Sequence, residues 1–493
     1  MEQESIDNQN SQCPLVVDLD DTLIRTDMLQ ESVFGLLRRN LFNIFLLPFW
    51  LLQGKAHMKQ MIADRVDMRV DLLPWHEGLL EYLRAERSRG RRLILATASN
   101  QRYAEEVAEQ LGIFDAVIGS TATENISGTL KLEKIEAILN GGAFEYAGNA
   151  AVDLMVWKKA EAAVLVNPSP LVKRRATALG NVKHIFEEKP NLLSNLLRAM
   201  RPHQWLKNML LFIPLIVSHQ IDDFDQIFNA FLGFVAFCLC ASSVYLLNDL
   251  LDLDSDRQHP RKRNRPFAAG KLPISYGVIA KVVLLLAALL LTLCLPPIFL
   301  LVLVAYYLLT TAYSLWLKRA ALVDGLVLAG LYSMRLVAGG AATEVAPSFW
   351  LLAFSIFIFL SLAFIKRYSE LLLPHESGDA KLAGRGYKQV DMETLAQFGT
   401  ASGYISVLVL AFYINSGGVN ELYARPEALW LLCPMMLYWI SRMWLLTRRG
   451  EMHDDPVVFT IRDPRTWLLA VFAGISLGVA VFWSWVVNTL AMA

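Results

Sequence analysis

The chain has 493 residues, and its 46 basic and 46 acidic residues balance, so the overall charge gives no reason to expect a nucleic-acid partner. Up to about Asn191, apolar and charged residues alternate as in a soluble protein, whereas long apolar runs recur from about Leu206 onward. This change predicts a soluble domain over residues 1–190 and a membrane domain over residues 191–493. The first residues lack the basic start and apolar core of a secretory signal, so we expect the soluble domain in the cytoplasm.

The first candidate site follows a short apolar run near the start of the chain. Residues 14–21 are predicted to form a strand that leads into Asp18-x-Asp20-x-Thr22. A carboxylate at the carboxyl end of a buried strand is where an open α/β sheet places its chemistry. The pattern resembles the nucleophile motif of the haloacid dehalogenase superfamily, over about residues 14–170. The resemblance implies an α/β fold, with a Rossmann-type parallel sheet and a small helical cap.

The same resemblance implies roles for individual residues. Asp18 would form an aspartyl-phosphate, and Asp20 would act as general acid and base. Thr97, at the end of a second strand, is the candidate phosphate-binding hydroxyl. Lys134 is the candidate for neutralising the phosphate, with Lys131 as the alternative.

The fourth motif of that family departs from the usual pattern. Family phosphatases generally have Gly-Asp-x-x-x-Asp, but this chain has Gly148-Asn149-x-x-x-Asp153. We expect Asp18, Asn149 and Asp153 to bind Mg²⁺, since an amide oxygen is a neutral ligand for the ion. The site nevertheless has one negative charge fewer. Two hypotheses therefore stay open: an active phosphatase, and a regulatory or docking module.

One apolar stretch interrupts the soluble part of the sequence. Residues 40–53 are apolar, shorter than a membrane crossing, and contain Pro48. The pattern is compatible with an interfacial helix and equally with packing inside a helical cap.

The C-terminal half is predicted to be an all-α bundle of nine transmembrane helices, since a crossing needs about 20 mostly apolar residues. With the soluble domain in the cytoplasm, loops 248–273, 317–320, 366–397 and 447–466 would face inward, and they hold nearly all the loop Lys and Arg. We therefore expect a multi-pass protein of the bacterial inner membrane. The expected crossings lie near 205–219, 227–247, 274–294, 297–316, 321–341, 348–365, 398–416, 427–446 and 467–489.

The most specific motif lies where one of these helices is predicted to end. It reads Asn248-Asp249-x-x-Asp252-x-x-x-Asp256, and helical spacing places the three carboxylates on nearly one face. Like charges so close repel unless a cation lies among them, and oxygen ligands of this kind suit Mg²⁺ bridging to a substrate phosphate. We therefore expect a diphosphate substrate, with Arg265 as the basic residue most suited to it.

The motif NDLLDLDSD, followed by RPFAAGKL, resembles the first aspartate-rich motif of the UbiA superfamily of intramembrane prenyltransferases. The resemblance covers about residues 198–490, and the nine-helix count agrees with it. It implies a helical-bundle cavity that opens to the cytoplasmic face. Two polar motifs would hold Mg²⁺ and a diphosphate there.

The second motif indicates the branch of the family. Aromatic prenyltransferases have paired aspartates here, but this chain offers only Asp324, between Lys318 and Arg335. That pattern resembles the decaprenyl-phosphate phosphoribosyltransferase branch, as do residues 201–208, 366–370 and 384–387. This branch implies phosphoribosyl pyrophosphate and a polyprenyl phosphate as substrates. The substrate-binding residues expected in this half are Asn248, Lys207, Arg265, Lys318, Asp324, Arg335, Lys366 and Arg367.

Asp324 and Arg335 fall within one predicted membrane helix, where ionisable residues are costly and mark function by default. A structural ion pair between these two residues is the alternative interpretation.

Three functions remain open at this point. The first is phosphoribosyl transfer to a polyprenyl phosphate in cell envelope biosynthesis, with the N-terminal domain removing the 5-phosphate of the product. The second is transfer of a prenyl group from a prenyl diphosphate to an aromatic or other acceptor. The third is a non-catalytic transporter or scaffold, which the aspartate cluster disfavours. The sequence leaves open whether the chain forms a homo-oligomer.

Overall fold

The computed structural model describes residues 13–188, 190–218, 222–372, 385–417, 419–452 and 455–492. The chain forms two compact units. The first comprises Met1–Arg201 with Tyr245–Val282, and the second comprises Pro202–Val244 with Val283–Ala493. The aspartate-rich segment, expected within the membrane domain, therefore packs in the same unit as the N-terminal residues.

A six-stranded parallel sheet forms the centre of the first unit, in the order β3-β2-β1-β4-β5-β6. The short, apolar β1 pairs with β2 on one side and with β4 on the other. Parallel strands need crossover connections, and the helices between them supply these. The expected α/β fold is confirmed. The strands are β1 Leu15–Val17, β2 Leu93–Asn100, β3 Ala116–Ser120, β4 Glu145–Gly148, β5 Ala162–Val166 and β6 Val182–Phe186.

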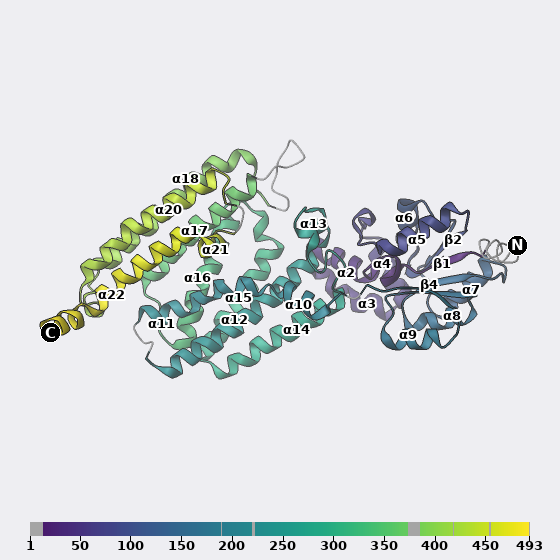
Figure 1. The fold of residues 1–493 in the computed structure, drawn as a ribbon, viewed down its shortest axis with the longest axis horizontal. Helices are drawn as coiled ribbons and strands as arrows, with labels where there is room; N and C mark the ends of the chain where they lie inside the picture. The colour runs from purple at the N-terminus through teal and green to yellow at the C-terminus, as the bar shows by residue number, and fades with distance from the viewer. Residues whose placement is uncertain are drawn as a thin grey trace. The chain divides into compact units, whose positions relative to one another are not determined.

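Helices cover both faces of this sheet (Figure 1). Helices α5 (Glu77–Ser88) and α6 (Gln101–Leu111) lie on one face. Helices α7 (Thr129–Ile138), α8 (Leu154–Lys159) and α9 (Pro170–Thr177) lie on the other. Successive strand side chains point to opposite faces, so Leu15 and Val17 join the first core and Val16 joins the second.

A helical cap is inserted between β1 and β2. It begins after the turn η1 (Leu19–Leu23) and consists of α2 (Met28–Arg39), η2 (Leu41–Phe45), α3 (Leu46–Leu52), α4 (Lys55–Ala63) and η3 (Val70–Leu72). Residues 40–53 belong to it. Trp50 packs against Leu36 and Ile62, while Phe45 and Phe49 are 67% and 64% exposed. One face of this segment therefore belongs to the hydrophobic core of the cap, and the other face is exposed.

The segment that follows the long helix α12 (Phe224–Leu251) docks on this cap. It contains α13 (Leu253–Gln258) and η6 (Lys262–Asn264). Arg257 donates two hydrogen bonds to Glu31, at 2.6 and 3.1 Å, and both side chains are buried. The Thr26 hydroxyl donates a third bond to Glu31, at 2.8 Å. Gly270, with φ of 65°, passes so close to Arg25 that a Cβ would lie 2.6 Å from the Arg25 Cβ.

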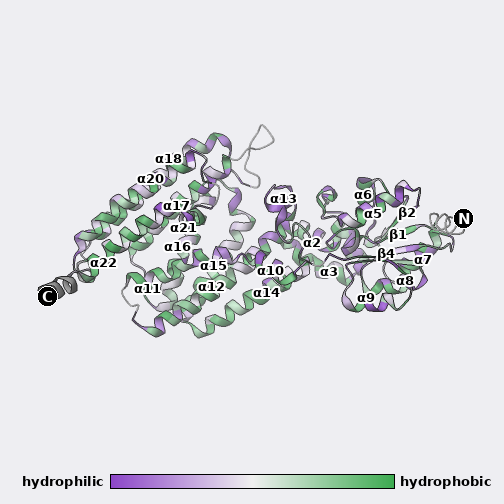
Figure 2. Cartoon of the chain, in the orientation of Figure 1, coloured by the Kyte–Doolittle hydropathy of each residue, from purple (hydrophilic) through white to green (hydrophobic). Residues whose placement is uncertain are grey.

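Within the described ranges, eight helices are long and apolar enough to cross a membrane. The helices of the C-terminal half are hydrophobic along most of their length (Figure 2). Their spans are Phe224–Leu251, Ile274–Cys294, Pro297–Leu315, Val323–Thr343, Phe349–Leu371, Gln389–Ile414, Pro426–Arg448 and Pro464–Trp483. The corresponding helices are α12, α14 (Ile274–Leu291), α15 (Pro297–Leu315), α16 (Val323–Thr343), α17 (Phe349–Leu371), α18 (Met392–Ile414), α20 (Leu432–Arg448) and α22 (Pro464–Met492).

The first of the nine expected crossings differs. Up to residue 218 it forms η5 (Pro202–Phe212) and the short helix α11 (Ile213–Val217) in place of one long helix. Pro214 lacks a backbone N–H and fits only the first turn of a helix, so a new helix starts there. The remaining short elements are α10 (Leu192–Met200), η4 (Ala151–Asp153), η7 (Thr292–Cys294), η8 (Leu317–Arg319), η9 (Gln389–Asp391), α19 (Val419–Leu422), η10 (Pro426–Leu431) and α21 (Pro456–Arg462).

Small residues let the helices of the second unit approach closely. A Cβ on Gly399 of α18 would lie 2.0 Å from the Trp444 ring of α20, and the Trp444 indole N–H donates to Ser361 at 3.1 Å. Close contact through small residues, with interhelical hydrogen bonds, is how membrane helices associate.

The Arg257–Glu31 pair yields a first prediction. Arg257→Ala leaves the Glu31 carboxylate buried without its cation, which costs roughly 3–5 kcal/mol. We expect a clearly lower apparent melting temperature for the purified full-length protein. Arg69→Ala is the control, because the Arg69–Asp71 ion pair is exposed and its loss should leave the melting temperature unchanged. Equal melting temperatures for the two variants would contradict the prediction.

Candidate active sites

The carboxyl ends of β1, β2 and β4 bring the N-terminal candidate residues together. Asp18 follows β1 directly, Thr97 lies within β2, and Asn149 follows β4. Because these strands are neighbours and parallel, their ends meet at one edge of the sheet. The first motif therefore lies beside residues distant in sequence: Asp20 meets Thr97, 77 positions away, and Thr22 meets Asn149, 127 positions away.

Asp18 is buried at this edge beside a lysine. Its carboxylate lies 3.0 Å from the Lys131 Nζ and accepts the Leu19 backbone N–H at 2.9 Å. Burial raises the pKa of Asp18 to about 7, although the charge of Lys131 opposes the shift. The neighbouring carboxylates of Asp153 and Asp20 add to the increase. A cation at this edge would relieve that repulsion.

Lys131, the alternative in the sequence analysis, holds the position expected for Lys134. Lys131 is buried and faces Asp18, whereas Lys134 lies on the outer side of α7 and pairs with Glu124 at 2.8 Å. Residues three positions apart lie only about 60° apart around a helix, so the spacing alone does not choose between the two lysines, and the packing of α7 on the sheet does. The geometry favours Lys131 as the cation of this site.

Asp20 is held by two hydroxyl groups and a backbone donor. Ser99 donates at 2.7 Å, Thr97 at 3.2 Å, and the Met28 N–H at 2.8 Å. Ser99 was not among the expected residues. Its signal was its place two positions after Thr97 on the same strand, which puts both side chains on one face.

Asp153 and Asn149 sit at the end of β4. The Asp153 carboxylate accepts hydrogen bonds from the Tyr146 hydroxyl at 3.0 Å and from the backbone N–H groups of Asn149 and Ala150 at 3.0 and 2.9 Å. The Asn149 amide oxygen accepts the Thr22 hydroxyl at 3.3 Å. Two carboxylates and an amide oxygen at one edge are hard donors of the kind that Mg²⁺ takes.

The aspartate-rich segment differs from the expectation in one respect. The expected cation among its carboxylates is Mg²⁺, but a protein side chain already lies there, since Arg265 donates to both Asp249, at 3.1 Å, and Asp256, at 2.6 Å. Arg201 also donates to Asp249. Burial raises the pKa of Asp256, and Arg265 opposes the shift. Arginine therefore offsets the repulsion between these two carboxylates.

The helix is interrupted inside the motif. Helix α12 ends at Leu251 and α13 begins at Leu253, so Asp252 lies at the junction and is half-buried, as is Asn248. Among the described residues, no group of three or more His, Cys, Asp or Glu side chains is gathered as a metal site. The assignment of Asp249, Asp252 and Asp256, and of Asp18, Asn149 and Asp153, as Mg²⁺ ligands therefore stays a prediction. The donor types suit the ion.

In the second unit, Asp324 is surrounded by cations. Its carboxylate, fully buried on α16, pairs with Arg367 of α17 and, at 2.8 Å, with Arg385. The Tyr313 hydroxyl also donates to it at 2.8 Å. Glu370 pairs in turn with Arg367 at 2.6 Å. Arg385 was not among the substrate-binding residues expected from the sequence, although it lies in the motif 384–387, of which Gly384 falls outside the described residues.

Arg335 does not pair with Asp324, so the ion-pair alternative is wrong. Its guanidinium is buried, donating to the Asn208 side chain at 2.8 Å, to the Leu331 carbonyl and to the Tyr306 hydroxyl. It also lies over the rings of Phe237, Tyr306 and Tyr332, 5.2 to 5.6 Å from their centroids. Neutral oxygens and aromatic faces hold this charge.

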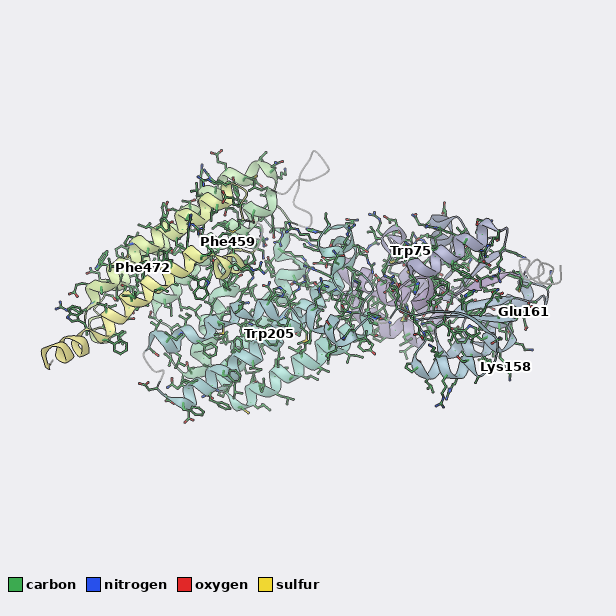
Figure 3. All side chains as sticks on the ribbon, viewed as in Figure 1. Trp75, Lys158, Glu161, Trp205, Phe459 and Phe472 are labelled. Atoms are coloured by element: carbon green, nitrogen blue, oxygen red, sulfur yellow. The ribbon has the colours of Figure 1, made fainter. Side chains whose placement is uncertain are left out.

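Lys207 and Lys366 share one carboxylate. Both donate to Asp455, at 2.8 and 2.9 Å, from η5 and α17. Burial would raise the pKa of Asp455, but the two lysines hold it well below its usual value. Trp205, labelled in Figure 3, precedes Lys207 on η5 and donates its indole N–H to Ser242 at 3.0 Å. Lys318 lies half-buried on η8, and Asp454, beside Asp455, lies outside the described residues.

The sequence model of the UbiA prenyltransferase family matches residues 210–469. The chain belongs to this family. A haloacid dehalogenase-like hydrolase model matches residues 15–154. The protein is therefore a multi-pass UbiA-family membrane enzyme with a haloacid dehalogenase-like domain at its N-terminus.

Curated relatives of this UbiA-family chain cover both halves. Protein y4nM of Sinorhizobium fredii is 34% identical over 459 residues, which are 92% of this chain and 89% of that protein. The nodulation protein NoeC of Azorhizobium caulinodans is 35% identical over 281 residues, 57% of this chain and 91% of its own. The decaprenyl-phosphate phosphoribosyltransferase of Mycolicibacterium smegmatis is 38% identical over 302 residues, 60% of this chain and 94% of its own.

The two lysines of α7 yield the second prediction. With a small aryl phosphate as substrate, Lys131→Met should lower phosphate release about 10²–10³-fold, the usual cost of one electrostatic group at a reacting centre. Lys134→Met, on the same helix, should keep the rate of the unchanged protein, because the Lys134 ammonium donates to Glu124 at 2.8 Å, whereas Lys131 is the lysine beside Asp18. A loss confined to Lys134→Met would instead restore the original assignment.

Proposed function

We propose that this UbiA-family enzyme transfers phosphoribose from phosphoribosyl pyrophosphate to a polyprenyl phosphate, with Mg²⁺, and releases pyrophosphate. The observation that supports this most is the excess of cations in the second unit. Arg367 and Arg385 share Asp324 and Glu370, Lys207 and Lys366 share Asp455 alone, and Arg335 hydrogen-bonds only neutral groups, so five cations meet three carboxylates. Two phosphate-bearing substrates would need such a set, whereas a neutral aromatic acceptor would not.

Similarity to a curated relative agrees with this choice. The relative from Mycolicibacterium smegmatis is a decaprenyl-phosphate phosphoribosyltransferase by name, and the match spans 94% of its length. The single aspartate at position 324 fits as well, because residues 313–340 offer no second aspartate to pair with it, as the motif for a metal-bound prenyl diphosphate would.

The reaction balances with these residues. The bond between the anomeric carbon and the pyrophosphate oxygen breaks, and an oxygen of the lipid phosphate forms the new bond to that carbon. Negative charge accumulates on the departing pyrophosphate, and Arg265, already bridging Asp249 and Asp256, is suited to contact it. Mg²⁺ bound at Asp249, Asp252 and Asp256 would supply further charge stabilisation. Lys207, Lys366 and Arg335 would hold the phosphates of the ribose and of the lipid.

We further propose that the haloacid dehalogenase-like domain removes the 5-phosphate of the product. Asp18 would attack phosphorus, and the bond to the ribose oxygen would break as Asp20 protonates that oxygen. Water would then release phosphate from Asp18, with Asp20 accepting the proton. The contacts that support these roles are the Lys131 cation beside Asp18 and the hydroxyls of Ser99 and Thr97 that orient Asp20.

The third prediction tests the transfer step. Purified protein is incubated with Mg²⁺, labelled phosphoribosyl pyrophosphate and a polyprenyl phosphate, and the lipid is analysed by mass spectrometry. Label should enter the lipid, and Asp249→Asn should lower the rate about 10²–10³-fold by removing one charge from the site. Chelation of the metal should abolish transfer. Activity with a prenyl diphosphate and an aromatic acceptor, without ribosyl transfer, would replace this function by the alternative.

The fourth prediction tests the soluble domain in the same assay. The unchanged protein should yield a ribosyl lipid that has lost one phosphate, whereas Asp18→Asn should accumulate the phosphoribosyl lipid at an unchanged transfer rate. Asp249→Asn is the matched control, since it should lower transfer and leave hydrolysis of added phosphoribosyl lipid intact. If the unchanged protein releases no phosphate from that lipid, the domain is a regulatory or docking module.

A further inference from the structure

The cap of the N-terminal domain exposes a row of large apolar side chains. Phe42, Phe45, Phe49 and Leu52 are 68%, 67%, 64% and 86% exposed. Elsewhere in the described residues 13–188, no large apolar side chain is more exposed than Leu171, at 52%. We refer to these four residues as the apolar cap face. Each such side chain left in water forgoes about 1.5–3 kcal/mol of burial, so a row of four requires an explanation.

The row is built into a folded segment. The four residues follow one another at intervals of three and four, which places them on one side of η2 and α3. The opposite side is anchored, because Trp50 is buried against Leu36, Met58 and Ile62. Arg65 lies over the Trp50 ring, 4.8 Å from its centroid. The exposed face is therefore presented by a segment whose other face is core.

The helix before this face is tied to the end of a membrane-spanning helix. Arg38, in the last turn of α2, pairs with Asp254 at 3.2 Å, and Asp254 lies three positions beyond the end of α12. Two turns earlier on α2, Glu31 pairs with Arg257 of the same segment. The apolar cap face thus begins four residues after Arg38, which contacts the segment directly after the candidate membrane span of α12.

The charge of this region complements a lipid surface. No acidic residue occurs between Glu31 and Asp64, while Arg38 and Arg39 precede the apolar segment and Lys55 follows it. Basic residues flanking an apolar helical face are typical of helices that lie in the interface of an anionic bilayer. At 12 residues, the apolar segment Leu41–Leu52 is too short to cross.

We propose that the apolar cap face inserts into the surface of the bilayer and holds the cap of the N-terminal domain there as a monotopic anchor. The partner is the acyl and headgroup boundary of a membrane that contains anionic phospholipid. The aromatic side chains would enter the acyl region, and Arg39 and Lys55 would remain among the headgroups.

A single helix would connect this anchor to the candidate phosphatase site. Helix α2 begins where the Met28 N–H donates to Asp20, and it ends at Arg39, two residues before the apolar segment. Its 12 residues span about 18 Å at 1.5 Å per residue. If the proposed function holds, this distance brings a phosphate carried by a lipid within reach of the edge that bears Asp18. The anchoring itself does not depend on that function.

The test uses the full-length protein in vesicles of phosphatidylethanolamine and phosphatidylglycerol. Cys294→Ser removes the exposed native thiol, the other cysteines in the described residues being buried. An environment-sensitive fluorophore is then attached at Phe49→Cys, with Phe45→Cys as a second position. Leu171→Cys, on α9 of the same domain, is the control. Quenching is measured with nitroxide-bearing phospholipid and, separately, with aqueous iodide.

We expect the labels at positions 45 and 49 to lose fluorescence to the nitroxide lipid and to be protected from iodide. The label at position 171 should show the reverse. Iodide quenching at positions 45 and 49 equal to that at position 171, without a nitroxide effect, would overturn the proposal. Protection from both quenchers would also overturn it, because a second copy of the chain or another protein would then cover the face. Neither readout depends on enzymatic activity.

Discussion

Burial of charge is the constraint on which the candidate sites depend. Asp324 is fully buried in a membrane-spanning helix, and the cations of Arg367 and Arg385 with the Tyr313 hydroxyl make that burial tolerable. A lone carboxylate there would cost several kcal/mol. The same requirement operates at Asp18 beside Lys131, although burial still leaves the pKa of Asp18 raised to about 7. In each site, therefore, burying one of these charges without its partner would be energetically unfavourable.

This constraint also explains how a site can be stable before substrate binds. Arg265 bridges Asp249 and Asp256, and Asp455 bridges Lys207 and Lys366. A phosphate group that enters can exchange partners with such pairs, because it supplies to arginine or lysine the charge that the carboxylate supplied. The carboxylates released in this way are the ligands that Mg²⁺ prefers. Under the proposed function, ion pairing and substrate binding would therefore use the same side chains.

The fusion of the two domains has a physical basis in the first compact unit. The segment that carries the aspartate-rich motif of the UbiA family docks on the cap of the haloacid dehalogenase-like domain through the buried Arg257–Glu31 pair. The cap is therefore not only an insertion in the domain that carries Asp18. It is also a support for a loop whose residues belong, by family, to the membrane enzyme. Contacts of this kind keep both motifs in one folded unit, whichever reaction each performs.

The sequence by itself determined the features that depend on neighbours along the chain. The two domain classes, the strand that ends at Asp18, the helical spacing of Asp249, Asp252 and Asp256, and eight of the nine expected apolar spans all follow from local periodicity and composition. The remaining span, 205–219, is interrupted at Pro214, because proline fits only the first turn of a helix even where the sequence is apolar. The aspartate motifs identified both families because their residues lie close together in sequence.

Only the tertiary structure decided which side chains meet. Lys131 and Lys134 are equally basic on one helix, and the packing of α7 on the sheet selected Lys131. Asp324 and Arg335 share a helix, yet Asp324 pairs with arginines 43 and 61 positions away, and Arg335 with Asn208, 127 positions away. Eleven residues place Asp324 and Arg335 about three turns apart, too far for their side chains to meet. Partners of buried charges come from other elements, whose approach no local pattern records.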